Sequence, residues 1–127
     1  VPLRSAYCAA KHGLIGYHDA LRAETTHQGV EVLVVAPGSV RTNVSRNALD
    51  ASAGVRGKSD AVIDAGMDPA EAAKRIVDAI EAGVRELILA EGMEAEIVKM
   101  RRADPDALFD SMAEMIAAGY ASKMDAT

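Results

Sequence analysis

Residues 30–36, Val-Glu-Val-Leu-Val-Val-Ala, form a nearly continuous run of apolar and mostly β-branched side chains. A strand with one face in water alternates apolar and polar residues, whereas a continuous run is typical of a strand covered on both faces of a parallel sheet. Pro37 and Gly38 end the run, because proline cannot donate a hydrogen bond to a neighbouring strand. The run therefore predicts an α/β fold, in which helices cover the faces of a parallel sheet.

Helical patterns lie on both sides of this strand. Residues 5–28 carry apolar residues at helical spacing, and Gly29 is expected to end that helix. Asp68 and Pro69 are typical of a helix start, so a second helix is predicted up to about Ala82. The residues expected to point inward from it are Ala73, Ile76, Val77 and Ile80.

The remaining chain continues the alternation. Residues 85–90 predict a second short strand, and two helices are expected over 93–102 and 105–118. Residues 39–67 are rich in Ser, Asn, Asp and Gly, which predicts a long, partly irregular loop with a short helix. Loops of this length in a compact domain are usually either functional lids or disordered segments. The order of elements implies right-handed crossovers and a parallel sheet.

Tyr7 and Lys11 are the first candidates for chemistry. Residues four apart share one face of a helix, so a phenol and an ammonium would lie side by side. A free tyrosine gives up its proton only near pH 10, and a neighbouring positive charge stabilises the phenolate. The pair therefore predicts an acid/base unit, although Tyr-x-x-x-Lys by itself also arises by chance on helix surfaces.

Composition narrows the possible partners. A formal net charge of −5 and four aromatic residues (three Tyr, one Phe) argue against a nucleic-acid-binding protein. No apolar run approaches the ~18 residues of a membrane span. One cysteine, Cys8, leaves no internal disulfide and no metal-binding cysteine cluster, which favours a reducing, cytoplasmic location. No metal site is predicted, because the histidines lack a ligand spacing.

The spacing of these features resembles a known family. Tyr7-Cys-Ala-Ala-Lys11, a helix, a buried strand and then Pro37-Gly-Ser-Val-Arg-Thr42 resemble the C-terminal half of a short-chain dehydrogenase/reductase, and the finer pattern resembles its member-7-like subgroup. The resemblance implies that residues 1–127 are the C-terminal portion of a single doubly wound, parallel-sheet domain of Rossmann type. It also implies an oxidoreductase that moves a hydride between NAD or NADP and a small alcohol or carbonyl substrate.

The resemblance assigns roles to individual residues. Tyr7 would exchange a proton with the substrate oxygen, and Lys11 would stabilise the phenolate and bind the hydroxyls of the nicotinamide ribose. Four residues would hold the nicotinamide end of the cofactor: Pro37, Gly38, the backbone of Val40 and the hydroxyl of Thr42. Thr42 could instead be a plain turn hydroxyl, and the polarity of the loop explains Arg41 and Asn43 as well as a ligand contact does.

Three parts of the family pattern do not occur in these 127 residues: the glycine-rich turn, the residue that selects between NAD and NADP, and the catalytic serine. Ser5 lies too close to Tyr7 to replace that serine. We therefore expect the chain to be part of a longer protein, with the dinucleotide-binding N-terminal half missing, and to be inactive alone. The resemblance implies self-association through the helix at 5–28, which would cover the stripe of small residues on that helix. The alternative is a truncated, non-catalytic fragment that retains only dimerisation helices.

Overall fold

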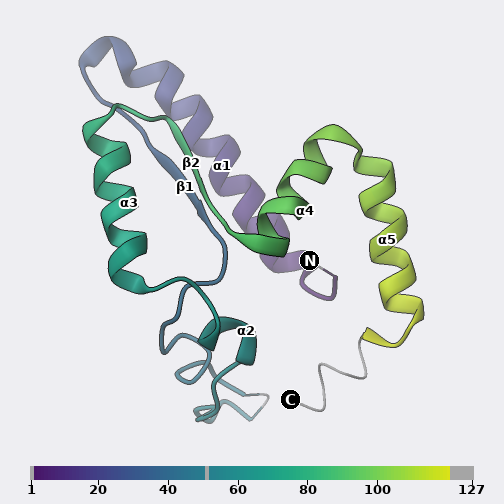
Figure 1. The fold of residues 1–127 in the computed structure, drawn as a ribbon. Helices are drawn as coiled ribbons and strands as arrows, with labels where there is room; N and C mark the ends of the chain where they lie inside the picture. Colours follow the sequence, from purple (N-terminus) through teal and green to yellow (C-terminus); the bar gives the residue numbers. More distant parts are fainter. Residues whose placement is uncertain (1, 51, 121–127) are drawn as a thin grey trace. The chain divides into compact units, whose positions relative to one another are not determined.

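The structure is a computed structural model that describes residues 2–50 and 52–120. Figure 1 shows its elements in chain order, which are α1 (Ser5–Thr25), η1 (Thr26–Gln28, a 3-10 helix), β1 (Val34–Pro37), α2 (Ala61–Asp64), α3 (Pro69–Glu81), β2 (Glu86–Leu89), α4 (Gly92–Ala103) and α5 (Pro105–Ala117). The chain divides into two compact units. The first holds α1, η1, α4 and α5, and the second, Val35–Glu91, holds α2, α3, β2 and most of β1.

The helix α1 ends close to its predicted boundary. After Thr25 the chain tightens into η1, and Gly29 follows with a φ of 78°, the left-handed conformation that glycine adopts without strain. The N–H of Gly29 donates to the carbonyl of Thr26 at 3.1 Å. The predicted stop at Gly29 is therefore confirmed. Arg22 then fixes the returning chain, since its Nε donates to the carbonyl of Val32 at 3.2 Å.

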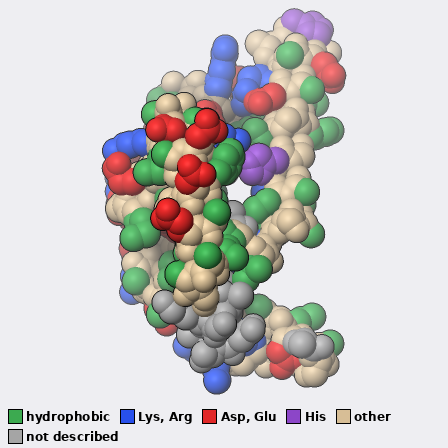
Figure 2. Space-filling model, turned by 90° about the vertical axis from the view of Figure 1, so that its right-hand side faces the viewer, with side chains coloured by type: hydrophobic (Ala, Val, Ile, Leu, Met, Phe, Trp, Pro, Cys, Tyr) green, Lys and Arg blue, Asp and Glu red, His purple; other side chains and the backbone are tan. Residues whose placement is uncertain are grey.

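The helices α4 and α5 form a pair that packs together within the first unit. Asp104 lies between the two helices. Its side chain accepts a hydrogen bond from the N–H of Ala107 and so caps the start of α5. The guanidinium of Arg101 lies 5.1 Å from the centre of the Phe109 ring, and Leu108 is buried. Figure 2 faces the side that carries α5 and shows acidic side chains running along it among hydrophobic ones. Both predicted helices are thus confirmed.

The second unit is built on a two-stranded parallel sheet. The N–H of Gly38 continues the pairing beyond β1 and donates to the carbonyl of Leu89 at 2.9 Å. The prediction of a strand over residues 30–36 was wrong for its first half, because β1 begins only at Val34. The reason is that β2, the strand with which β1 pairs, is only four residues long.

The helix α3 covers β2 with a different face from the predicted one. Ala72 and Ala79 are buried, and they lie seven residues apart, which is two helical turns. Their small side chains let the helix approach β2, with which it is in contact. Ile76 is half-buried, as expected, but Val77 and Ile80 are exposed, and so is Ala73. The helix carries two adjacent apolar stripes, one of bulky and one of small side chains. The prediction chose the bulky stripe, whereas the residues buried in the structure belong to the stripe of small side chains.

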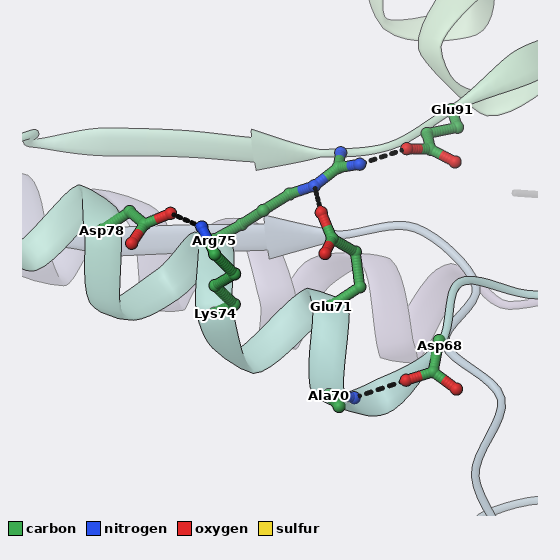
Figure 3. Close-up of polar contacts among 7 residues, drawn as sticks. All are labelled: Asp68, Ala70, Glu71, Lys74, Arg75, Asp78 and Glu91. Carbon is green, nitrogen blue, oxygen red and sulfur yellow. Dashed lines mark hydrogen bonds and ion pairs between the residues drawn. The ribbon is translucent and has the colours of Figure 1, made fainter.

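Polar contacts hold α3 at its start and against the end of β2 (Figure 3). The side chain of Asp68 accepts a hydrogen bond from the N–H of Ala70 at 2.9 Å, which confirms the predicted helix start. Arg75 bonds Glu71 one turn earlier and also Glu91, just beyond β2. Hydrogen bonds to these two carboxylates raise the pKa of Arg75 above its ordinary value. Arg75 therefore links the helix to the segment that follows the sheet.

The loop between β1 and α3 is internally bonded, and it contains the short helix that the sequence predicts. That helix, α2, is capped by Asp60, whose side chain accepts a hydrogen bond from the N–H of Val62 at 2.9 Å. In an earlier turn the Asp50 carboxylate accepts from the N–H groups of Ser52 and Gly54 and from the Ser52 hydroxyl. These hydrogen bonds, the one from the Ser52 hydroxyl first, lower the pKa of Asp50.

None of the helices in residues 2–50 and 52–120 combines the length and the apolar character needed to cross a membrane.

Replacing Leu89 tests the small core of the second unit. Leu89 is 3% exposed beneath α3, and Leu89→Ala is expected to lower the free energy of unfolding by about 2–4 kcal/mol through lost burial and a cavity. Leu49→Ala is the matched control, since Leu49 is 69% exposed in the same unit and its loss should cost less than about 0.5 kcal/mol. Urea unfolding of the full-length protein measures both, and equal losses would contradict the described core.

Acidification tests the Asp50 turn. The pKa of the folded Asp50 carboxyl is lowered, so the charged carboxylate supports the turn above that pKa, and its support is lost as pH falls through it. The amide NMR signals of Ser52 and Gly54 are expected to titrate with a midpoint below the usual aspartate value of about 3.9. In Asp50→Asn this titration should disappear. A midpoint at or above the usual value would argue against the observed hydrogen bonds.

Candidate functional site

Tyr7 and Lys11 lie side by side on the first part of α1. The Nζ of Lys11 is 5.5 Å from the centre of the Tyr7 ring, within the range in which a cation is attracted to an aromatic face. The Tyr7 residue is 57% exposed. Tyr7 and Lys11 are therefore neighbours on the helix, as their spacing in the sequence predicts, and the Lys11 ammonium lies over the Tyr7 ring.

The other four predicted residues follow the carboxyl end of β1, in the second unit. Pro37 is the last residue of β1 and is exposed. Gly38 is held by its hydrogen bond to Leu89 of β2. The segment therefore leaves the sheet at the carboxyl edge of a parallel strand, the edge at which ligands bind in open α/β folds.

Val40 forms a parallel bridge with Met67, at the far end of the loop. The two hydrogen bonds of the bridge are made by the residues beside Val40: the N–H of Arg41 donates to the carbonyl of Met67, and the N–H of Met67 donates to the carbonyl of Ser39, each at 2.9 Å. In a parallel pair this pattern turns the N–H and C=O of the middle residue to the opposite edge. Among the described residues, neither backbone group of Val40 has a hydrogen-bond partner.

The backbone N–H and C=O of Val40 could together bind an amide group. Backbone N–H and C=O groups are strong hydrogen-bonding groups that are usually paired in a folded protein. Val40 is half-buried, and its N–H and its C=O lie on the same edge of the chain. A ligand that carries one acceptor and one donor side by side, such as a carboxamide, matches them.

Thr42 lies two residues further on and is exposed. Its Oγ1 accepts a long hydrogen bond, 3.4 Å, from the N–H of Val44. This contact agrees with the alternative role of Thr42, that of a hydroxyl group stabilising a local turn. The hydroxyl keeps its own hydrogen to donate, so the turn contact leaves a ligand contact possible.

Arg41 pairs with Asp68, the residue that begins α3. One carboxylate oxygen of Asp68 bonds the guanidinium of Arg41, and the other accepts from the N–H of Ala70. Both charged side chains are about half exposed, so the pair adds little to stability. Its geometric effect is to connect the segment after β1 to the start of α3.

The sequence did not identify Gly66 and Met67 as neighbours of this segment. They are more than twenty residues away from Val40 in the chain, and no local pattern indicates which part of a long loop returns to a strand end. The only available signal was position, since Gly66 and Met67 directly precede the helix start at Asp68.

The six predicted residues are distributed over both units. Tyr7 and Lys11 belong to the first, and Pro37, Gly38, Val40 and Thr42 to the second. In the part of the chain that the structure describes, no group of three or more His, Cys, Asp and Glu side chains could hold a metal ion.

Comparison with known proteins gives a consistent set of relatives. The sequence profile of the family described as short chain dehydrogenase matches residues 1–53. Dehydrogenase/reductase SDR family member 7B from Bos taurus is 35% identical over 113 residues, which cover 89% of this chain and 35% of that protein. Its namesake from Danio rerio is 40% identical over 90 residues, or 71% of this chain and 29% of that protein.

A third relative comes from an insect. Dehydrogenase/reductase SDR family protein 7-like from Drosophila melanogaster is 34% identical over 114 residues, which cover 90% of this chain and 35% of that protein. No solved structure matches the chain. The chain spans about a third of the length of these curated relatives.

The matched profile begins with the segment that contains Tyr7 and Lys11 and extends past Thr42. The relatives extend the match over most of the remaining chain, and all three carry names of the same subgroup. The α/β architecture with its parallel strands is that of a partial Rossmann fold. The chain belongs to the short-chain dehydrogenase/reductase family, in its member-7-like subgroup.

Proposed function

We propose that this chain supplies the catalytic and nicotinamide-binding half of an NAD- or NADP-dependent oxidoreductase that acts on an alcohol or carbonyl substrate. The observation that carries the proposal is the open backbone edge of Val40 at the carboxyl end of a parallel strand. A nicotinamide carboxamide offers the acceptor and donor that this edge can bind. Thr42 adds a hydroxyl two residues away.

Tyr7 holds the proton of the reaction. When a carbonyl is reduced, the phenol hydroxyl of Tyr7 donates its proton to the carbonyl oxygen, and in the reverse direction the phenolate removes the proton of the alcohol. NAD or NADP, held by Lys11, Pro37, Gly38, Val40 and Thr42, would supply the hydride chemistry at the carbon that bears this oxygen. The exposure of Tyr7 supports this role, because a proton donor must reach its substrate.

Lys11 stabilises the charge that Tyr7 develops. Its ammonium lies over the Tyr7 ring, on the side chain that would carry negative charge after the proton transfer. The same ammonium would hydrogen-bond the hydroxyls of the nicotinamide ribose, as the family resemblance implies. Pro37 and Gly38 would leave room for the nicotinamide ring beside the backbone.

A second function is a non-catalytic module that associates through α1. The favouring observation is that α1 has no buried residue within the described chain, and that Leu14 and Tyr17 are more than half exposed on it. A helix with such side chains can pack against a second copy of the chain. This alternative requires no dinucleotide, which separates it from the oxidoreductase.

Dinucleotide titration tests the choice between the two functions. The full-length protein is expected to enhance or shift the fluorescence of NADH or NADPH on saturable binding. ADP-ribose, which has no nicotinamide, serves as the competitor that reports the other end of the site. Absence of binding for both reduced dinucleotides would rule out the oxidoreductase.

Removal of one phenol hydroxyl tests the role of Tyr7. Tyr7→Phe is expected to keep dinucleotide affinity and to lower kcat by about 10²–10⁴-fold, the usual contribution of a positioned acid or base. Tyr17→Phe is the matched control, since Tyr17 lies on the same helix and is 63% exposed, and it should leave kcat unchanged. Steady-state turnover with a saturating dinucleotide measures both. Full turnover in Tyr7→Phe would remove Tyr7 from the proton transfer.

A further inference from the structure

The two ends of the long loop meet in a structure that we call the loop neck, formed by residues 39–41 and 66–68. Its backbone contacts are the two hydrogen bonds of Met67, one from Arg41 and one to Ser39. Its side-chain contact is the ion pair between Arg41 and Asp68. The loop neck therefore holds the segment on both sides of Val40.

Gly66 sets how closely the two sides of the loop neck approach. A Cβ atom placed on Gly66 would lie 2.6 Å from the carbonyl oxygen of Ser39 and 2.7 Å from its carbonyl carbon. These are backbone atoms, which cannot rotate away as a side chain can. A larger residue at position 66 therefore forces the two sides of the loop neck to shift relative to each other, and Val40 directly follows Ser39 on one of them.

The interior of the loop has supports of its own. The N–H of Arg56 donates to the carbonyl of Ala48, and the N–H of Gly57 donates to that of Arg46. The hydroxyl of Ser45 accepts from the N–H of Asp60 at 3.0 Å. A change at Gly66 is therefore expected to act at the loop neck, because these bonds hold the interior of the loop independently of it.

We infer that Gly66 is a positioning residue for the nicotinamide end of the dinucleotide, and that it acts through Ser39 on the backbone of Val40. The inference rests on the proposed function, since it assumes that Val40 binds the carboxamide. Gly66 itself touches neither substrate nor cofactor. The Arg41–Asp68 pair supports the same alignment from the other end of the loop neck.

Gly66→Ala and Gly54→Ala form a matched pair of variants. Both glycines lie in the same loop, and neither has a positive φ. A Cβ on Gly54 would meet the Asp50 carboxylate at 3.2 Å, a side chain that can move, whereas a Cβ on Gly66 would meet backbone. The two variants therefore differ in what the added methyl group displaces.

The readout compares a ligand that has the nicotinamide with one that lacks it. In the full-length protein, Gly66→Ala is expected to weaken binding of the reduced dinucleotide about tenfold, as misplacement of one or two hydrogen bonds would. Its affinity for ADP-ribose should stay unchanged, because ADP-ribose carries no nicotinamide for Val40 to bind. Gly54→Ala should bind both ligands like the unaltered protein.

A variant of the ion pair covers the case in which Gly66→Ala does not fold. Asp68→Asn keeps a side chain that caps a helix well and removes only the charge. It should weaken dinucleotide binding, but not ADP-ribose binding, by about two- to threefold, as loss of a half-exposed ion pair would. Asp78→Asn, which removes a comparably exposed ion pair with Lys74 from α3, is the control and should have no effect.

The outcomes separate the two proposals. If the unaltered protein binds neither dinucleotide, the proposed function fails and the role of Gly66 fails with it. If it binds a dinucleotide but Gly66→Ala binds it equally well, or loses ADP-ribose to the same extent, the positioning role alone is overturned. If Gly66→Ala does not fold, equal behaviour of Asp68→Asn and Asp78→Asn overturns it.

Discussion

Main-chain hydrogen bonds carry the chain beyond the end of β1, first to Leu89 in β2 and then to Met67 at the far end of the loop. Because the pairing at Val40 is parallel, its partners are Ser39 and Arg41, and the polar groups of Val40 itself face the other way. A sheet of two short strands is thereby extended to Val40, whose backbone N–H and C=O lie on the edge away from Met67. The start of α3, the ends of the loop and the candidate nicotinamide site all depend on this pairing.

Local chemistry explains which parts of the fold could be predicted from sequence. The stop at Gly29 and the helix start at Asp68 follow from interactions within a few residues, and both are found as expected. The start of β1 and the packed face of α3 depend instead on what lies opposite. Since β2 is short, the valine-rich run is a strand only from Val34. Since alanines allow a closer approach, α3 turns its smaller stripe toward β2.

The same division applies to the candidate site. That Tyr7 and Lys11 lie next to each other follows from helical spacing alone, and the structure places the Lys11 ammonium over the Tyr7 ring. The motif after β1 could be recognised by its resemblance to a family, yet the contacts that hold it could not. Met67 and Gly66 reach it across a long loop, and sequence patterns of short range carry no information on such a return. Arg41, which the sequence left between a ligand contact and a solvated charge, is instead an ion-pair partner of Asp68.

A loop whose ends are tied together can change inside without disturbing what lies at its base. The entropy of closing a loop grows only slowly with its length, so residues added between Thr42 and Ala65 would cost little closure entropy while Gly66 and Asp68 stay in place. The length of the loop and the geometry of its base are therefore separate properties of this fold. A longer or shorter interior leaves Met67 able to make its two hydrogen bonds, one to Ser39 and one from Arg41.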